Sequence, residues 1–141
     1  MGVVVKRVYE PASSSDGVRV LVDRLWPRGL TKEDAAVKFW LREIAPSNEL
    51  RQWYHANAAG WSMFRKRYLK ELASAEGSAA VEKLHRVAEG KRPVTLLYAS
   101  RNEERNNATV LKELLEGMRK PPSSVGRGAV GRGRIRKAKR L

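Results

Sequence analysis

The chain has 141 residues, a formal net charge of +14, two histidines and no cysteine. The absence of cysteine excludes disulfides, thiolate nucleophiles and zinc–thiolate sites, and it fits a reducing cytoplasm. No apolar run approaches the roughly 20 residues needed to cross a bilayer, and the N-terminus has no signal-peptide pattern, so we expect a cytoplasmic protein with no membrane partner.

Two short strands are predicted near the N-terminus. Residues 3–9 are largely apolar, and residues 18–25 begin with a second apolar run rich in β-branched side chains. The loop between them, residues 10–17, is shorter than the dozen residues that a parallel crossover normally needs. The two strands are therefore antiparallel neighbours, or parallel with another strand between them, and we favour the second arrangement.

A polar corner and two helix starts follow the second strand. Pro27 interrupts regular structure, and Thr31 offers an N-cap for a helix that starts at 31–36. Residues 37–44 fit both helical spacing and strand alternation, and we favour a short helix followed by an extended segment. Ser47 is predicted to cap the next helix.

Two further helices are predicted in the middle of the chain. The first runs from about Trp61 to Ala73, with an aromatic stripe toward the core and a basic face, residues 65–70, that we interpret first as solvated surface. Gly77 is predicted to break the chain and Ser78 to cap the second helix. Gly90 suits the left-handed position after that helix ends.

The last predicted elements are a buried strand at 94–99 and a helix from about Glu103 to Arg119, whose inward face includes Met118. Residues 120–141 contain eight cations and no acid, so subtracting them leaves +6 on residues 1–119. This tail lacks aromatic residues and is rich in Gly, Arg and Lys, a composition that predicts a flexible segment.

Polar residues follow the strands at 18–25 and 94–99. If these strands are parallel neighbours, their carboxyl ends open into one crevice, which is where open α/β sheets bind ligands. Arginines and a helix N-terminus suit a phosphate or carboxylate group. The predicted ligand-binding residues are Asp23, Arg24, Arg28, Tyr98, Ser100, Arg101, Asn106 and Asn107.

Asp23 is also the weak candidate for a catalytic residue, because a carboxylate there could orient an arginine, accept a ligand hydroxyl or act as a base. The structural alternative is an ion pair from Asp23 to Arg24 or Arg28 that pins the corner, with Asn106 and Asn107 as ordinary helix-start residues. No metal site is predicted, because the two histidines lack ligand spacing. No cofactor is predicted either, because the sequence has no GxGxxG or phosphate-loop motif.

The tail supports a second hypothesis, association with nucleic acid. Arg132 and Arg134 lie in a Gly-Arg-Gly-Arg segment similar to the core of an AT-hook, followed by Arg136 and Lys137, although Ile135 stands where an AT-hook has proline. Salt-sensitive binding of nucleic acid or another polyanion through the tail and the 65–70 face is therefore predicted, with a solubilising extension as the alternative.

Four stretches resemble a known family: KRVYEPASSSDGVRVLVDRLWPRGLTKEDA, APSNELRQWY, FRKRYLKEL and VTLLYASRNEERNNATVLKELL. They are similar to the YeaO-like branch of a widespread bacterial and archaeal family of unknown function, domain of unknown function 488. The resemblance spans roughly residues 5–116. It implies a small cytoplasmic Rossmann-like α/β protein without an established activity.

Broader relatives of this branch resemble a pattern with cysteine at the position of Tyr98 and with Cys-His-Arg at residues 106–108. This chain has Tyr98 and Asn-Asn-Ala at those places. The resemblance therefore does not imply thiol or metal chemistry for this chain.

The sequence predicts one α/β domain over residues 1–119, with a short, mostly parallel sheet in a Rossmann-like three-layer arrangement, and a flexible basic tail at 120–141. The leading functional hypothesis is a binding domain for a small anionic ligand, phosphate- or nucleotide-like. The alternatives are association with nucleic acid through the tail and, more weakly, an enzyme in which Asp23 is the base and Arg28 stabilises negative charge. The sequence leaves the oligomeric state open.

Overall fold

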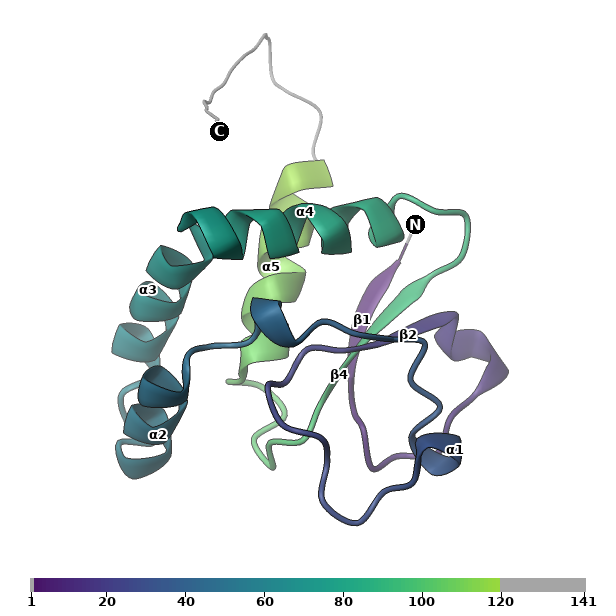
Figure 1. The fold of residues 1–141 in the computed structure, drawn as a ribbon, viewed down its shortest axis with the longest axis horizontal. Helices are drawn as coiled ribbons and strands as arrows, with labels where there is room; N and C mark the ends of the chain where they lie inside the picture. The colour runs from purple at the N-terminus through teal and green to yellow at the C-terminus, as the bar shows by residue number, and fades with distance from the viewer. Residues whose placement is uncertain (1, 120–141) are drawn as a thin grey trace, which may run out of the picture.

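The chain is described here from a computed structural model that covers residues 2–119 (Figure 1). The predicted tail, with Arg132, Arg134, Arg136 and Lys137, lies outside the described residues. No helix between residues 2 and 119 is long and apolar enough to cross a membrane.

Four strands form one fully parallel sheet in the order β1-β4-β2-β3. The strands are β1 (Val3–Arg7), β2 (Val18–Leu21), β3 (Phe39–Trp40) and β4 (Val94–Tyr98). β4 is buried along its whole length because it pairs with β1 on one side and with β2 on the other. The favoured arrangement, parallel β1 and β2 with another strand between them, is confirmed.

Five α-helices and two 3-10 turns complete the described chain. They are η1 (Ser14–Asp16), α1 (Lys32–Ala35), η2 (Arg42–Ile44), α2 (Asn48–Ala56), α3 (Trp61–Leu72), α4 (Ala75–Ala88) and α5 (Asn107–Arg119). The predicted caps Thr31 and Ser47 are confirmed, since their hydroxyls accept hydrogen bonds from the N–H groups of Asp34 and Leu50. The order predicted for residues 37–44, a short helix and then an extended segment, is wrong: the helix α1 ends before this range, and within it the extended pair β3 comes first and the 3-10 turn η2 follows.

The two faces of the sheet are covered differently. One face carries the larger apolar cluster, which joins the strands to α2, α3, α4 and α5. The other face carries a smaller cluster in which Leu21 and Leu97 are covered by residues of segment 22–37 and by Trp40. Segment 22–37 contains only the one-turn helix α1, so the layer on this second face is thin (Figure 1).

The predicted start of α4 is wrong. The cap is Ser74, whose hydroxyl accepts a hydrogen bond from the Gly77 N–H (3.1 Å), and the helix begins at Ala75. Gly77 therefore lies inside the first turn and does not break the chain. Its role is steric: a Cβ there would lie 2.3 Å from the Glu71 carbonyl oxygen at the end of α3.

Three smaller predictions also fail. Gly90 has no positive φ, and the residue that ends α4, Glu89, is right-handed (φ −78°), so α4 ends without the predicted left-handed residue. α5 begins at Asn107 rather than near Glu103, because the Asn102 side chain first holds a turn by accepting hydrogen bonds from two backbone N–H groups. Met118 does not face inward and is 45% exposed.

Candidate functional site

The connections after β2 and β4 leave the sheet toward opposite faces. β4 leads to α5, which packs on β1 and β4, whereas β2 leads into segment 22–37 on the other face. Adjacent parallel strands whose connections diverge in this way create a crevice at their carboxyl ends. We call this side of the molecule, formed by residues 8–10, 22–30 and 99–106, the carboxyl edge.

Asp23 bridges the crevice. Its Oδ2 accepts a hydrogen bond from the Ala99 N–H (2.9 Å), and its Oδ1 accepts one from Asn107 Nδ2 (3.0 Å). The same Asn107 nitrogen donates to the Val22 carbonyl oxygen (2.9 Å), and Trp40 Nε1 donates to the Asp23 carbonyl oxygen (2.8 Å). The two corners therefore converge as the strand pattern predicts, and the protein's own side chains span the space between them.

The backbone that leaves β4 is held from its other side by Arg7. This arginine donates from Nη2 to the Ala99 carbonyl oxygen (3.0 Å) and from Nε to the Ser100 carbonyl oxygen (2.9 Å). Its guanidinium also lies 5.0 Å from the ring centroid of Tyr9. Asp23 and Arg7 thus clamp Ala99 between them, which fixes the corner on which any site at this edge would be built.

Two of the three arginines predicted to face the crevice, Arg24 and Arg28, have different neighbours. Arg24 donates from Nε and Nη2 to the carbonyl oxygens of Pro46 and Ala45 (both 3.1 Å) and so ties the corner to the segment before α2. Arg28 is exposed, and its carbonyl oxygen accepts a hydrogen bond from the Tyr9 hydroxyl (2.9 Å). This places Arg28 beside the end of β1.

Two predicted ligand-binding residues are buried, each 2% exposed. Tyr98 packs in the larger apolar cluster, and burial is the largest cause of the raised pKa of its phenol. Asn106 caps α5, since its Oδ1 accepts a hydrogen bond from the Thr109 N–H (3.0 Å). Both side chains therefore have structural roles, Tyr98 in the apolar core and Asn106 as the cap of α5.

Ser100 and Arg101 are exposed, as Arg28 is. Ser100 Oγ accepts a hydrogen bond from the Asn102 N–H (3.1 Å). The side chains of Arg28 and Arg101 make no hydrogen bond or ion pair with any residue from 2 to 119. These three residues are the exposed members of the predicted set.

Sequence reasoning misses Arg7, Tyr9 and Arg51 at this edge. Arg7 follows Val3 and Val5 in strand alternation and so looks like an ordinary strand residue. Arg51 is exposed on α2, yet its positive charge is close enough to Asp23 to lower the pKa of that carboxyl. All three lie in the KRVYEP and APSNELRQWY stretches, which carry the family resemblance. That resemblance was the signal in the sequence that could have pointed to them.

Asp23 has a raised pKa. Burial is the largest cause, and it outweighs the hydrogen bonds from Asn107 and Ala99 and the charge of Arg51, which act in the opposite direction. The alternative of an Asp23 ion pair with Arg24 or Arg28 is not found within residues 2–119.

This raised pKa predicts a pH dependence. The folded state holds the Asp23 proton more tightly than the unfolded chain, so protonation contributes stability that is present below the ordinary pKa of 3.8 and lost as pH rises through the raised pKa. Relative to an Asp23→Asn variant, the wild-type chain should therefore lose stability over that rise in pH. Urea unfolding across a pH series measures this difference. A difference that is constant with pH, or a trend that the exposed-site variant Asp34→Asn reproduces, would contradict it.

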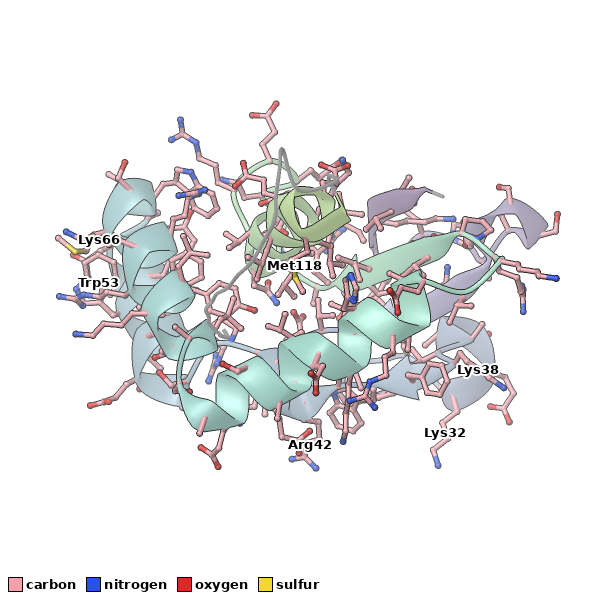
Figure 2. All side chains as sticks on the ribbon, turned by 90° about the horizontal axis from the view of Figure 1, so that it is seen from above. Lys32, Lys38, Arg42, Trp53, Lys66 and Met118 are labelled. Atoms are coloured by element: carbon pink, nitrogen blue, oxygen red, sulfur yellow. The ribbon has the colours of Figure 1, made fainter. Side chains whose placement is uncertain are left out.

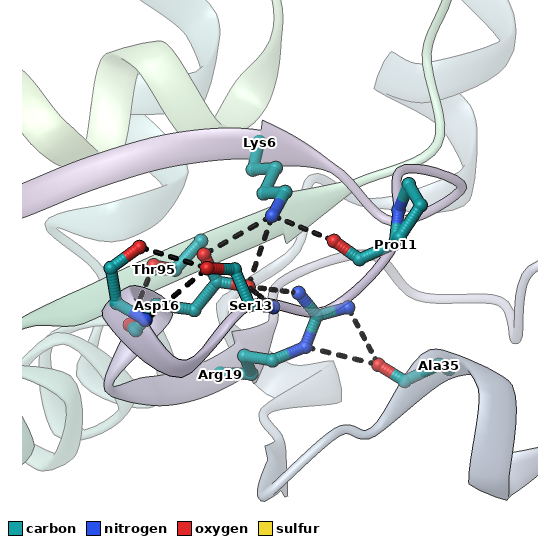
Figure 3. A network of polar contacts seen from close by, with 8 residues as sticks. Lys6, Pro11, Ser13, Asp16, Arg19, Ala35 and Thr95 are labelled. Atoms are coloured by element: carbon teal, nitrogen blue, oxygen red, sulfur yellow. Dashed lines mark hydrogen bonds and ion pairs between the residues drawn. The ribbon is translucent and has the colours of Figure 1, made fainter.

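A second polar cluster lies on the thinly covered face of the sheet (Figure 3). The Asp16 carboxylate accepts hydrogen bonds from Arg19 Nη1 (2.6 Å), from Lys6 Nζ (3.1 Å to each oxygen) and from the Ser13 N–H (3.0 Å). Thr95 on β4 donates to the Asp16 carbonyl oxygen (2.7 Å). Asp16 and Arg19 are only 7% and 4% exposed.

The remaining donors of this cluster reach neighbouring segments. Arg19 donates from Nε and Nη2 to the Ala35 carbonyl oxygen (3.1 and 2.7 Å), and Lys6 donates to the Pro11 carbonyl oxygen (2.8 Å). The cluster therefore fastens both the 10–17 loop and the end of α1 to the sheet. Because its charges are paired with one another, we interpret it as a structural clamp that the sequence analysis did not predict.

Neither groove described in the structure favours an anion. One, of about 300 Å³, lies between η2 and the first half of α4, and Glu43 and Glu76 offset Arg24 and Lys83 along its walls. The other, of about 360 Å³, lies between α3 and α5 and is mainly apolar. Among residues 2–119, no three His, Cys, Asp or Glu side chains are grouped so that they could hold a metal ion.

Comparison with known proteins assigns the family. Residues 2–123 match a family described as the inactive DUF488-N3 subclade. The chain is 46% identical to the uncharacterized protein YeaO of Escherichia coli over 118 residues, which cover 84% of this chain and all of YeaO. It is 44% identical to the uncharacterized protein Rv3073c of Mycobacterium tuberculosis over 113 residues, 80% of this chain and 92% of that protein. No solved structure matches. The resemblance noted in the sequence is thus confirmed, and the chain belongs to the YeaO-like DUF488 family, in its inactive N3 subclade.

Proposed function

We propose that this protein binds a small anionic ligand, phosphate- or nucleotide-like, at the carboxyl edge beside β1 and β4. The observation that carries the proposal is the bonding of Arg7. Its guanidinium is fixed by two neutral carbonyl oxygens, those of Ala99 and Ser100, and no carboxylate within residues 2–119 forms an ion pair with it. A positioned cation without a counter-charge attracts anions, and guanidinium suits phosphate and carboxylate.

Two further arginines support this location. Arg28 is joined to Arg7 through Tyr9, whose ring lies beside the Arg7 guanidinium and whose hydroxyl binds the Arg28 carbonyl oxygen. Arg101 follows Ser100, which Arg7 fixes. Both of these arginines are exposed. Together the three arginines, from the chain at or just after the ends of β1, β2 and β4, would supply the positive charge that a phosphate group requires.

Binding without turnover fits the site better than catalysis does. Both oxygens of Asp23, the candidate base, already accept hydrogen bonds from protein donors, so the fold positions this carboxylate and leaves only one acceptor site on each oxygen. We assign Asp23 the role of positioning Ala99 for the neighbouring arginine. The description of the subclade as inactive agrees with this assignment.

Thermal unfolding in the presence of inorganic phosphate, pyrophosphate and ATP tests the proposal. At a ligand concentration about 100 times its Kd, stabilisation of about 2.7 kcal/mol is expected, which corresponds to a rise of several degrees in Tm. Arg28→Ala should lose most of this rise without unfolding, because that side chain is exposed and forms no hydrogen bond or ion pair within residues 2–119.

Arg92→Ala is the matched control. Arg92 is also exposed and lies just before β4, at the opposite end of the strand. Its removal changes the net charge equally but should leave the Tm rise intact. The proposal fails if none of the three anions raises Tm, or if both variants lose the rise to the same extent.

A further inference from the structure

The pair of helices α2 and α3 carries a surface that the small-anion site does not use. Residues 50–70, which make up most of both helices, contain five Lys or Arg residues and no Asp or Glu. The two helices contact each other and form one end of the molecule (Figure 1). The cationic side chains of this segment therefore lie on neighbouring helices with no carboxylate interleaved between them in the sequence.

Most cations of α3 lack a counter-charge. Arg65 is paired with Glu113 of α5 (2.9 Å). Lys66, Arg67 and Lys70 are exposed, and their side chains form neither an ion pair nor a hydrogen bond within the described chain. In contrast, the exposed Arg86 and the half-buried Lys112 are each paired with a glutamate four residues away. The α3 surface thus carries three cations close together in the sequence that have no counter-charge within residues 2–119.

Arg67 also lies over an aromatic ring. Its guanidinium carbon lies 4.8 Å from the ring centroid of Trp53 on α2. Trp53 is half-buried and packed against the larger apolar cluster, so packing fixes the position of its ring beneath Arg67. Figure 2 shows Trp53 and Lys66 at one end of the molecule, with Lys32 and Lys38 at the other. Arg67 therefore has an exposed guanidinium group that lies over the Trp53 indole, and the exposed Lys66 and Lys70 lie near it on the same helix.

We propose that this α2–α3 surface, defined by Trp53, Lys66, Arg67 and Lys70, binds single-stranded nucleic acid. An unpaired base stacks on aromatic rings and on arginine planes, and the adjoining phosphates need cations at short intervals. The surface offers both: the Arg67 plane for a base and the two lysines for phosphates. The proposal is independent of the small-anion site, because it shares no residue with Arg7, Arg28 or Arg101.

The phosphate contacts are tested with the full-length chain and a fluorescein-labelled oligo(dT) or oligo(U), by anisotropy at several salt concentrations. For single strands, each phosphate contact contributes about 0.7 to the slope of log K against log salt. The double variant Lys66→Ala/Lys70→Ala should therefore reduce this slope by about 1.4. Residues 120–141 are present in every variant and contribute equally.

Lys32→Ala/Lys38→Ala is the matched control, because it removes the same charge from exposed side chains at the other end of the molecule. This control should leave the slope unchanged. An equal decrease in both double variants, or no decrease in Lys66→Ala/Lys70→Ala, would overturn the proposed surface.

Arg67→Lys separates stacking from charge. It keeps the cation and so should keep the salt slope, but it removes the plane on which a base stacks and should weaken binding at least about fivefold. Thermal unfolding of the variant checks that the α2–α3 pair is intact. Unchanged affinity of Arg67→Lys, or competition by poly-glutamate as effective as that by unlabelled oligonucleotide, would overturn the assignment to nucleic acid and indicate an acidic protein or a general polyanion instead.

Discussion

Replacing Asp16 by asparagine is expected to lower the free energy of unfolding by about 3–5 kcal/mol at neutral pH, the range typical for breaking a buried ion pair. The variant leaves Arg19, which is 4% exposed, without its carboxylate at 2.6 Å. Lys6 loses the same carboxylate. The amide that replaces it keeps one oxygen acceptor, but its NH2 group would face the N–H donors of Lys6 or Arg19. Urea or guanidinium unfolding monitored by tryptophan fluorescence measures the loss.

The pH dependence of Asp16 has the opposite sign to that of Asp23. Burial tends to raise the pKa of Asp16, but the hydrogen bonds from Ser13, Lys6 and Arg19 together outweigh it, so its pKa lies below 3.8. The ionised carboxylate therefore contributes stability above the ordinary pKa, and this contribution is lost as pH falls through the lowered one. The difference between wild type and Asp16→Asn should accordingly shrink in acid.

Two variants separate the buried charge from a general charge effect. Glu82→Gln breaks an ion pair with Arg86 whose side chains are 70% and 67% exposed, and exposed pairs contribute only about 0–1 kcal/mol. In contrast, Arg19→Met added to Asp16→Asn removes the unpaired buried cation and should recover part of the loss. A loss below about 1 kcal/mol in Asp16→Asn, or no recovery in the double variant, would show that the cluster is not the clamp described above.

The sheet could be predicted from the sequence because its strands obey local rules. Val94–Tyr98 is apolar on both faces and bounded by Pro93, which is the pattern of a central parallel strand. The short loop at 10–17 excludes a direct parallel crossover, and so it leaves two arrangements of β1 and β2, antiparallel neighbours or parallel strands with another strand between them, of which the second is favoured and found. The convergence of Asp23 with Asn107 follows from this arrangement, because parallel neighbours end at the same edge.

The Asp16 cluster could not be predicted in the same way. Arg19 lies between two valines of β2, and alternation there normally directs a charged side chain to solvent. It is buried because segment 22–37 folds back over this face and presents the Ala35 carbonyl oxygen to it. The spacing of residues in the sequence does not reveal such a long-range cover.

The candidate site, like the fold, could be predicted from the sequence only in part. The sequence predicts where the site lies, but it does not predict that Asn106 and Tyr98 are used by the fold or that Arg7 turns to the β4 corner. Strand alternation assigns a face to Arg7 but not the reach of its long side chain. These contacts depend on how the strand ends are placed in space, and so they required the structure.

Gly77→Ala and Gly117→Ala are expected to change stability in opposite directions, although both replace glycine by alanine inside a helix. Gly117 lies in α5 with nothing within 4 Å of an added Cβ, so the better helix propensity of alanine should stabilise the protein by up to about 1 kcal/mol. Gly77→Ala should instead destabilise it by about 1–3 kcal/mol, the usual effect of overpacking.

The difference arises at the junction of α3 and α4. A Cβ on Gly77 would lie 2.3 Å from the Glu71 carbonyl oxygen and 2.7 Å from the Leu72 Cα, and these backbone atoms cannot move aside as a flexible side chain can. The Glu71 carbonyl also accepts a hydrogen bond from the Ser74 hydroxyl (2.6 Å), so displacing it disturbs the cap of α4.

The disturbance should reach α2 as well, because the Glu71 carboxylate accepts hydrogen bonds from the Ser47 N–H (2.9 Å) and hydroxyl (2.6 Å) at the start of that helix. Hydrogen exchange can test this coupling: in Gly77→Ala, amides of both α4 and α2 should lose protection, whereas Gly117→Ala should leave them unchanged. Equal and favourable effects of the two alanines on the free energy of unfolding would mean that the close approach of α3 to α4 does not require glycine.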